Sequence, residues 1–245
     1  SVGTPTIIWM AVEASSTTCG LRRTDMNAFV RYTVMGIYKL FYNFRIEGWE
    51  NVPEKEGVII ASNHRSYADP VILTMPMKRP VTYMAKEELF HNKIFGAFIR
   101  FLGAFPVKRG AGDMQVIDDC VDILESGRNV VIFPEGTRSK ENKVGRGKTG
   151  VALIAAKSGA DVLPMGIVFE GPKLHFRSKV TLKIGKLIKS EELDIGDGSP
   201  KQLKLIKKRI MDSITELVEG PKPEIASENA GAIAGNTENS ADKAE

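Results

Sequence analysis

Residues 58–75 read VIIASNHRSYADPVILTM, and this stretch decides the fold. Its first four residues are apolar and mostly β-branched, which predicts a buried strand. Residues 70–75 predict a short helix, with Asp69 as its cap and Pro70 at its first position. The stretch is therefore a strand, a polar loop and a helix. Loops at the ends of such strands are where α/β proteins place their chemistry.

Strand and helix patterns continue to alternate after this stretch. Apolar runs predict strands at residues 81–85, 130–133, 162–169 and 180–184, and a short strand precedes the cations Lys108 and Arg109. Helices are predicted at residues 90–101, 113–126, 149–158 and 199–218. We therefore expect a single α/β domain over residues 46–222, with a mixed, mostly parallel sheet flanked by helices.

An amphipathic helix is predicted before this domain, over residues 24–45. Apolar residues recur at spacings of three and four from Met26 to Phe44, beside the cations Arg31 and Lys39. Such a stripe fits a helix packed on the core or one lying in a membrane interface. Residues 1–23 predict a disordered extension, and residues 223–245 predict a disordered acidic tail.

Composition excludes several classes of protein. Apolar residues make up 42% of the 245 residues and charged residues 26%, which is ordinary for a folded globular chain. No run of 18 apolar residues occurs, so a standard membrane-spanning helix is not expected. The formal net charge is +4; residues 224–245 contribute −4, which leaves +8 on residues 1–223. Such a charge favours an anionic partner: a nucleic acid, a phosphate-bearing substrate or a membrane surface.

The loop at residues 63–70 contains a candidate catalytic pair, His64 and Asp69. A carboxylate five residues away, across a turn, can reach one imidazole nitrogen, fix the tautomer and stabilise the imidazolium. The pair would then act as a general base, and a substrate hydroxyl would be the nucleophile. From spacing alone, the alternative is that Asp69 only caps the helix and His64 is an ordinary loop residue. No metal ligand set is apparent nearby.

Two further loops have the residues of an anion site. The segment FPEGTRS at residues 133–139 follows a predicted strand and offers a glycine, hydroxyls and the planar donors of Arg138. The segment GAFPVKRG at residues 103–110 brings Lys108 and Arg109 to a glycine turn. Each segment taken alone is equally compatible with an ordinary polar or solvated turn.

Together these segments resemble one family, the glycerolipid acyltransferases typified by 1-acylglycerol-3-phosphate acyltransferase. The family has four ordered blocks. Asn63, His64 and Asp69 match the first; Gly103, Phe105 and Arg109 match the second; residues 133–139 match the third without a gap; and Pro164 lies in the fourth, an apolar strand. The resemblance covers about residues 26–218, and its first and third blocks are the most specific.

The resemblance implies a reaction and a role for each residue. An acyl group passes from a thioester to the 2-hydroxyl of 1-acylglycerol-3-phosphate and gives phosphatidate, with His64 as the base and Asp69 orienting it. The substrate-binding residues implied are Arg109, Glu135, Gly136, Thr137 and Arg138, where Glu135 orients Arg109, Arg138 or a substrate hydroxyl. Asn63, Gly103 and Pro164 support the site, and Pro164 shapes the acyl pocket.

The resemblance also implies the partners. The co-substrate is acyl-coenzyme A or an acyl-carrier protein, and neither a metal nor a bound cofactor is expected. Because the acceptor is a lipid, we expect a peripheral or monotopic protein at the cytoplasmic face of the cell membrane. Three alternatives remain: another lysolipid acceptor, a non-catalytic lipid-binding module on the same fold and, least favoured, a nucleic-acid-binding protein, for which no recognition motif is present.

Overall fold

The fold is described from a computed structural model of the chain. The structure describes residues 32–33, 35–54, 57–107, 113–193, 195 and 198–221. The predictions for residues 1–23 and 223–245, for the start of the amphipathic helix and for Arg109 lie outside the described residues. The α/β architecture with a mixed, mostly parallel sheet is confirmed.

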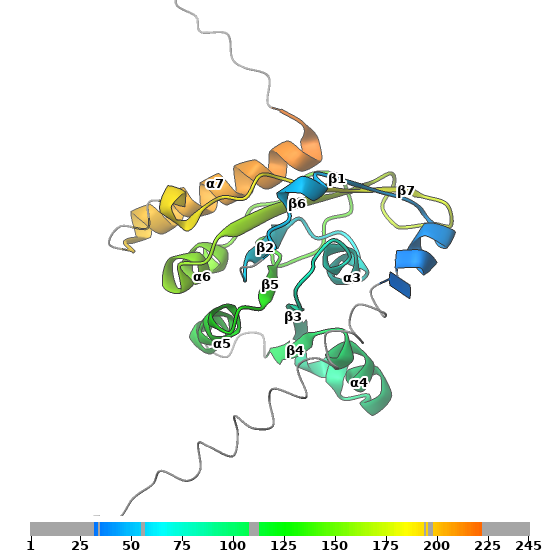
Figure 1. Cartoon of the computed structure of the whole chain (residues 1–245), viewed down its shortest axis with the longest axis horizontal. Coiled ribbons are helices and arrows are strands. Elements are labelled where there is room, and N and C mark those ends of the chain that lie inside the picture. The colour runs from blue at the N-terminus through cyan, green and yellow to red at the C-terminus, as the bar shows by residue number, and fades with distance from the viewer. Residues whose placement is uncertain are drawn as a thin grey trace, which may run out of the picture.

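A seven-stranded sheet forms the centre of the domain, in the order β1-β7-β6-β2-β5-β3-β4 (Figure 1). Every neighbouring pair is parallel except β6 and β7, so β1 and β7 run opposite to the other five strands. The strands are β1 (Asn43–Glu47), β2 (Ile59–Ser62), β3 (Val81–Lys86), β4 (Ala104–Val107), β5 (Asn129–Ile132), β6 (Val162–Phe169) and β7 (Lys179–Ile184).

Helices cover both faces of this sheet (Figure 1). The α-helices are α3 (Asp69–Thr74), α4 (Lys93–Phe101), α5 (Asp113–Glu125), α6 (Gly150–Ser158) and α7 (Pro200–Glu219), and the short 3-10 helices are η1 (Trp49–Asn51), η2 (Glu87–Phe90) and η3 (Ser190–Leu193). One apolar core lies between the sheet and α5, α6 and α7. The other lies between the sheet and α3 and α4. None of the helices in the described part of the chain is both long and apolar enough to cross a bilayer.

Strand β2 shows why the central strands read as unbroken apolar runs. Ile59 and Ala61 point into the core beneath α5–α7, and Ile60 points into the core beneath α3 and α4. All three side chains are fully buried. A strand covered on both faces needs apolar residues at every position rather than at alternate ones. The loop that follows β2 therefore starts from one of the most rigid positions in the domain.

The N-terminal helix is shorter than the sequence predicts. Residues 35–41 are helical, but residues 43–47 form strand β1 beside β7. Phe44 fits both patterns, since it lies three residues after Phe41 and also alternates with exposed Asn43 and Arg45. Pairing with β7 decides the outcome, so the sheet begins at Asn43, and the predicted helix boundary at residue 45 was wrong.

Several helix ends follow their predicted signals. Ser199 caps α7 by accepting a hydrogen bond from the amide of Gln202, with Pro200 directly after it. Gly159 ends α6 with a φ of 62°, a conformation that costs glycine little. Helix α4 begins at Lys93 rather than at residue 90, because the side chain of Asn92 accepts from the amide of Phe95.

Candidate active site

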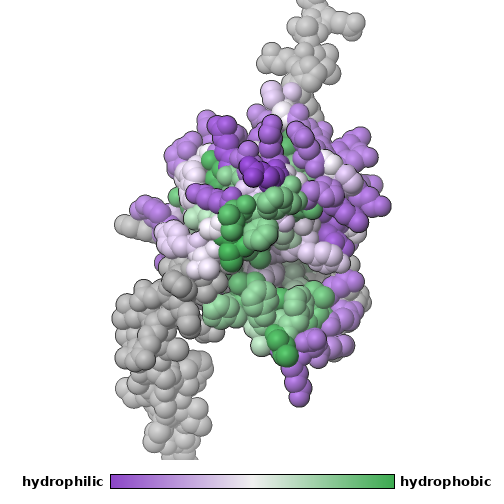
Figure 2. Space-filling model, turned by 90° about the vertical axis from the view of Figure 1, so that its right-hand side faces the viewer, coloured by the Kyte–Doolittle hydropathy of each residue, from purple (hydrophilic) through white to green (hydrophobic). Residues whose placement is uncertain are grey.

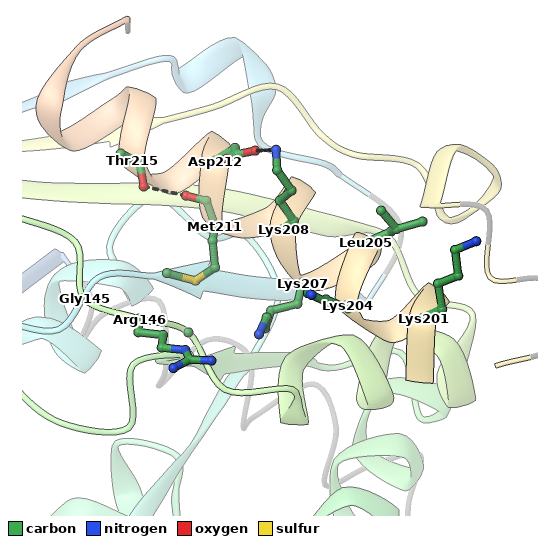
Figure 3. A pocket seen from close by; sticks show the side chains of 11 residues that line it. Gly145, Arg146, Lys201, Lys204, Leu205, Lys207, Lys208, Met211, Asp212 and Thr215 are labelled. Atoms are coloured by element: carbon green, nitrogen blue, oxygen red, sulfur yellow. Dashed lines mark hydrogen bonds and ion pairs between the residues drawn. The ribbon is translucent and has the colours of Figure 1, made fainter. Parts of the chain in front are cut away.

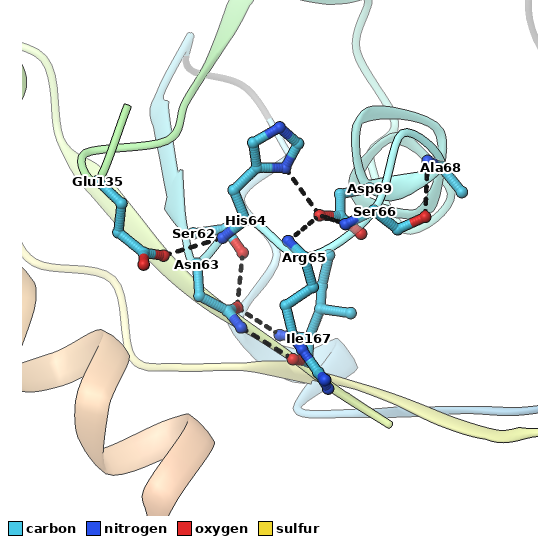
Figure 4. Close-up of polar contacts among 9 residues, drawn as sticks. All are labelled: Ser62, Asn63, His64, Arg65, Ser66, Ala68, Asp69, Glu135 and Ile167. Atoms are coloured by element: carbon cyan, nitrogen blue, oxygen red, sulfur yellow. Dashed lines mark hydrogen bonds and ion pairs between the residues drawn. The ribbon is translucent and has the colours of Figure 1, made fainter. Parts of the chain in front are cut away.

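The predicted catalytic pair lies at the carboxyl end of β2 (Figure 4). Nδ1 of His64 is 2.8 Å from Oδ2 of Asp69. The Asp69 side chain is fully buried, whereas 20% of the His64 side chain is exposed. We call residues 62–69 the histidine loop. It holds the carboxylate inside the protein and presents the imidazole at the surface.

Backbone amides, as well as His64, fix the carboxylate of Asp69. Its Oδ2 accepts hydrogen bonds from the amides of Arg65, at 2.5 Å, and Ser66, at 2.7 Å. An ionised carboxylate can only accept, so Nδ1 of His64 is the donor and Nε2 is left with a free lone pair. The sequence predicted Asp69 as the cap of α3. That prediction was wrong: Ala68 occupies the cap position, and the Asp69 side chain turns back toward the loop.

A tyrosine from the N-terminal helix lies near the same carboxylate. Burial, then Tyr42 and then Asp69 raise the pKa of Tyr38 to about 12. Tyr38 therefore stays protonated, as a neutral group, throughout the physiological range. Oδ1 of Asp69, the other carboxylate oxygen, is buried without a hydrogen-bond partner among the described residues. Tyr38 also packs against the apolar core beneath α3 and α4.

The imidazole plane is held by an aromatic ring from the next strand of the sheet. Phe133 directly follows β5, and its ring stacks on His64 with centroids 4.0 Å apart and planes 19° apart. Phe133 is the first residue of the third block, but no role was predicted for it. Its position after a strand and before Pro134 was the available signal. Stacking restricts rotation of the imidazole and keeps Nε2 aimed in one direction.

Glu135 joins the two loops of the site. Its Oε1 accepts from the amide of His64 at 3.0 Å, and its Oε2 accepts from the amide of Gly145 at 2.9 Å. The side chain is 7% exposed. The resemblance implies that Glu135 orients an arginine or a substrate hydroxyl. Instead, among the described residues, its partners are main-chain amides, and it sets the backbone position of His64.

Asn63 anchors the histidine loop to β6. Its side chain donates to the carbonyl of Ile167 at 2.9 Å and accepts from the amide of the same residue at 2.8 Å. A carboxamide bonded this way replaces a step of the sheet ladder where β2 ends. Asn63 is 2% exposed and lies beneath His64 (Figure 4). The supporting role that the resemblance implies is consistent with this position.

Arg65 is a buried structural residue for which no role was predicted from the sequence. Its guanidinium donates to the carbonyls of Phe169 at 2.6 Å, Gly171 at 2.7 Å and Lys140 at 3.2 Å, and to the side chain of Asn142. Burial lowers its pKa, and Asp69 opposes that shift. The only available signal was a charged residue next to His64 in the same loop. Because Arg65 is 6% exposed, its charge needs these hydrogen-bond partners.

The segment after β5 forms the outer wall of the site. We call residues 133–148 the arginine loop. Its amide at Ser139 donates to the carbonyl of His64 at 2.8 Å, which ties the two loops a second time. Thr137 and Arg138 are exposed. Gly136 has a φ of 69°, and a side chain there would meet Lys148 at 3.0 Å.

Arg138 reaches across to the histidine loop. Its guanidinium lies 3.7 Å from the ring centroid of Tyr67, and Nη2 donates to the Tyr67 hydroxyl at 2.9 Å. The Tyr67 side chain is 76% exposed. In the described part of the chain, Arg138 forms no ion pair, so its charge is available to an anion. An exposed cation beside an accessible histidine suits a phosphate-bearing substrate.

Two of the predicted supporting residues have positions explained by the sheet. Gly103 precedes β4 with a φ of 100°, and a side chain there would meet the carbonyl of Val81 at 2.2 Å, so it is needed for a tight turn. Pro164 lies in β6 beside Ala61, where the β6–β7 ladder ends, and its carbonyl accepts from Gly185 at 2.9 Å. Its predicted role in an acyl pocket stays a prediction.

The sequence of this chain is similar to those of known acyltransferases. Residues 43–168 match the family model described as acyltransferase. The 1-acyl-sn-glycerol-3-phosphate acyltransferase of Bacillus subtilis is 32% identical over 66% of this chain and 81% of its own length. That of Streptococcus pneumoniae is 32% identical over 71% of this chain and 62% of its own. The chloroplastic enzyme LPAT1 of Arabidopsis thaliana is 32% identical over 60% of this chain and 42% of its own.

The fold of this chain is similar to that of an acyltransferase of known structure. The crystal structure of the 1-acyl-sn-glycerophosphate (LPA) acyltransferase PlsC from Thermotoga maritima matches 80% of this chain and 82% of that one, with a TM-score of 0.62 and 26% identity. The chain spans between about two fifths and two thirds of the length of the first three curated relatives. Fold, sequence and family model agree, and the chain therefore belongs to the acyltransferase family.

Proposed function

We propose that this protein transfers a fatty acyl group from an acyl thioester to the 2-hydroxyl of 1-acylglycerol-3-phosphate and so makes phosphatidate. The observation that carries the proposal is the pair of His64 and Asp69, with a buried carboxylate on Nδ1 and an accessible imidazole. The names of the relatives support this choice of acceptor. Family membership supports acyl transfer as the reaction class.

The reaction follows from the free lone pair of His64. Nε2 removes the proton of the acceptor hydroxyl as the oxygen attacks the thioester carbonyl, and Asp69 stabilises the imidazolium formed. The tetrahedral intermediate collapses, the carbon–sulfur bond breaks, and the imidazolium returns the proton to the sulfur. A new ester and a free thiol result. A positioned base of this kind contributes about 10²- to 10⁴-fold to the rate.

The acceptor phosphate is assigned to the arginine loop. Arg138 is exposed, unpaired by any described carboxylate and positioned by Tyr67 next to the histidine loop. Its planar donors match two phosphate oxygens. The Thr137 hydroxyl can add a further donor to the same group, whereas the Gly136 amide that the resemblance assigns to the substrate already donates to the carbonyl of Phe133. Arg109, which the sequence resemblance also assigns to phosphate, remains part of this proposal.

We also propose that the protein docks on the cytoplasmic face of a membrane as a peripheral or monotopic protein. Figure 2 shows apolar side chains gathered on the face where α4 and the N-terminal helix lie. Large apolar residues are exposed there: Ile37, Leu40, Phe41, Ile94, Phe95, Phe98 and Phe101. A helix with one apolar face lies in the membrane interface, and a basic protein is attracted to anionic lipid.

Docking can be tested with vesicles that contain phosphatidylglycerol. The variant with Phe95→Ser and Phe98→Ser should partition about tenfold or more weakly, because two large apolar side chains no longer enter the interface. Met114→Ser is the matched control, since Met114 is 52% exposed but lies on α5, on the other face of the sheet. Equal loss in both variants would contradict docking through α4.

The reaction itself is tested by thiol release. Wild type, given acyl-coenzyme A and 1-acylglycerol-3-phosphate in detergent, should release thiol and form phosphatidate. Both should fall to background in His64→Ala, with the fold checked by circular dichroism. Thiol release with another lysolipid, and not with 1-acylglycerol-3-phosphate, would show that the acceptor is that other lysolipid. If the protein binds lipid but turns over neither acyl-coenzyme A nor acyl-carrier protein, a non-catalytic lipid-binding module is favoured.

A further inference from the structure

A basic groove lies between the end of the arginine loop and helix α7 (Figure 3). Its volume is about 580 Å³, which is in the range of small-molecule sites. One wall is residues 145–147, and the other is the exposed side of α7. The lining residues are Gly145, Arg146, Gly147, Lys201, Lys204, Leu205, Lys207, Lys208, Met211, Asp212 and Thr215. None of these residues has a role in the proposed chemistry.

The charge of the groove is largely uncompensated. It has five basic residues and one acidic residue, Asp212. Nζ of Lys208 pairs with Asp212 at 2.6 Å. Arg146, Lys204 and Lys207 form no ion pair with any described residue, and neither does Lys201. Cations converging on one concavity from two separate segments raise the local concentration of an anion.

The groove has an apolar side as well as cations. Met211 and Leu205 line it from α7, and Leu205 is 55% exposed. Gly147 allows the loop to lie against the helix, since a side chain there would come within 2.5 Å of the sulfur of Met211. An apolar surface with several converging cations suits a ligand that has both a flat ring and phosphates. A flat protein partner would not need such a hollow.

One carboxylate connects the groove to the catalytic histidine. Gly145, in the wall of the groove, donates its amide to Oε2 of Glu135, and Oε1 of the same side chain accepts from His64. The wall of the groove and the histidine loop are thus bonded to the same side chain. A ligand bound in the groove and extended past Glu135 would bring its far end toward the imidazole.

We propose that this groove binds the adenine nucleotide part of an acyl-coenzyme A donor. Coenzyme A has a purine ring, a diphosphate and a 3′-phosphate at one end, and its thioester lies at the end of a long pantetheine arm. The ring lies on Met211, and the phosphates contact Arg146, Lys204 and Lys207. Binding energy from this non-reacting part lowers the KM for the donor. The inference rests on the proposed acyl transfer.

The test compares two thioester donors with the same acyl chain, acyl-coenzyme A and acyl-pantetheine, which lacks the nucleotide. In the variant with Lys204→Gln and Lys207→Gln, the KM for acyl-coenzyme A should rise about tenfold or more, because charge-assisted contacts to phosphate are lost. The KM for acyl-pantetheine should change little. The control is Arg128→Gln with Lys186→Gln, two exposed cations outside the groove, which should leave both values unchanged.

Other results would overturn the assignment. An unchanged KM for acyl-coenzyme A, or an equal rise for both donors, would exclude nucleotide binding in the groove. Loss of activity only with acyl-carrier protein, or loss of binding to anionic vesicles only, would make the groove a docking surface for that macromolecule.

Direct binding separates this inference from the proposed reaction. Coenzyme A binding is measured by calorimetry without an acceptor, in wild type and in the Lys204 and Lys207 variant. If no donor is turned over, the proposed reaction fails, yet binding that weakens about tenfold in the variant still supports the nucleotide site. Equal affinity of the two proteins for coenzyme A would overturn it.

Discussion

The histidine loop and the arginine loop lie side by side at the same edge of the sheet, but they are built differently. In the histidine loop, Asn63, Arg65 and Asp69 are buried and bonded to the main chain. In the arginine loop, Thr137 and Arg138 are exposed, and Arg138 is positioned by an exposed tyrosine. In the proposed reaction, the base must be fixed before the substrate arrives, whereas cations that bind a phosphate can remain solvated until it does.

The largest effect is expected from Asp69→Asn. The carboxamide oxygen would stay on the amides of Arg65 and Ser66, and the neutral side chain would no longer stabilise the imidazolium that forms on His64 during the proposed reaction. We expect kcat to fall by about 10²- to 10⁴-fold, with a smaller change in KM. Because the carboxylate no longer faces the imidazole, the dependence of the rate on pH should differ between wild type and variant.

Steady-state kinetics across pH checks this prediction, with Asp118→Asn as the control for loss of one carboxylate. Asp118 pairs with Lys157 on the surface. A wild-type pH profile retained in Asp69→Asn would mean that the buried carboxylate does not set the state of the imidazole. The buried hydrogen bonds of Asp69 would then stabilise the loop without affecting the reaction.

Glu135→Gln is expected to have the next largest effect, because this residue belongs to both loops. A carboxamide can accept from only one of the two amides, so either His64 or Gly145 loses its acceptor. We expect the free energy of unfolding to fall by about 1–3 kcal/mol and kcat by about tenfold. Urea unfolding and kinetics measure the two quantities, with exposed Glu141→Gln as the control. An unchanged kcat would show that the loops act independently.

Arg138→Ala should affect binding rather than the chemical step. We expect the KM for the acceptor to rise about tenfold, since charge-assisted hydrogen bonds to phosphate are lost, with a smaller change in kcat. Arg138→Lys retains the charge without the planar donors and should fall between wild type and Arg138→Ala. If kcat falls as much as in Asp69→Asn, Arg138 acts in the chemical step, and the proposed difference between the two loops is wrong.

Tyr67→Phe should have the smallest effect. It removes the hydroxyl that accepts from Arg138 but keeps the ring beneath the guanidinium. An exposed contact of this kind is worth about 0.5–1 kcal/mol, so the KM for the acceptor should change about two- to fivefold. Tyr67→Ala removes both contacts and should approach Arg138→Ala. Identical kinetics for wild type and Tyr67→Ala would show that the pair has no part in binding.

Much of the fold could be predicted from local sequence. Strand β6 and the ends of α6 and α7 follow directly from apolar runs and capping residues, because these signals depend on near neighbours. Strand β1 could not be predicted this way. Its identity depends on pairing with β7, which is more than 130 residues away in sequence, and Phe44 satisfied the helical period equally well.

The candidate site shows the same division. The spacing of His64 and Asp69 allowed their contact, because the loop between them is short, but the family resemblance was needed to choose this contact over a helix cap. The roles of Glu135, Phe133 and Arg65 required knowledge of which strands are neighbours. Strand β2 lies between β5 and β6, so residues from these three strands meet at His64. A carboxylate beside an arginine in sequence invites an ion pair, but here the nearby main chain supplies its partners.

The bond between Asn63 and Ile167 also has a consequence for synthesis of the protein. Two residues separated by 104 positions must meet before the histidine loop has its final shape. The Arg65 contact with Phe169 spans the same distance along the chain. While β6 is still inside the ribosome, the histidine loop has been synthesised but lacks the contacts that give it its final shape. Catalytic competence should therefore arise late in translation, after most of the domain has emerged.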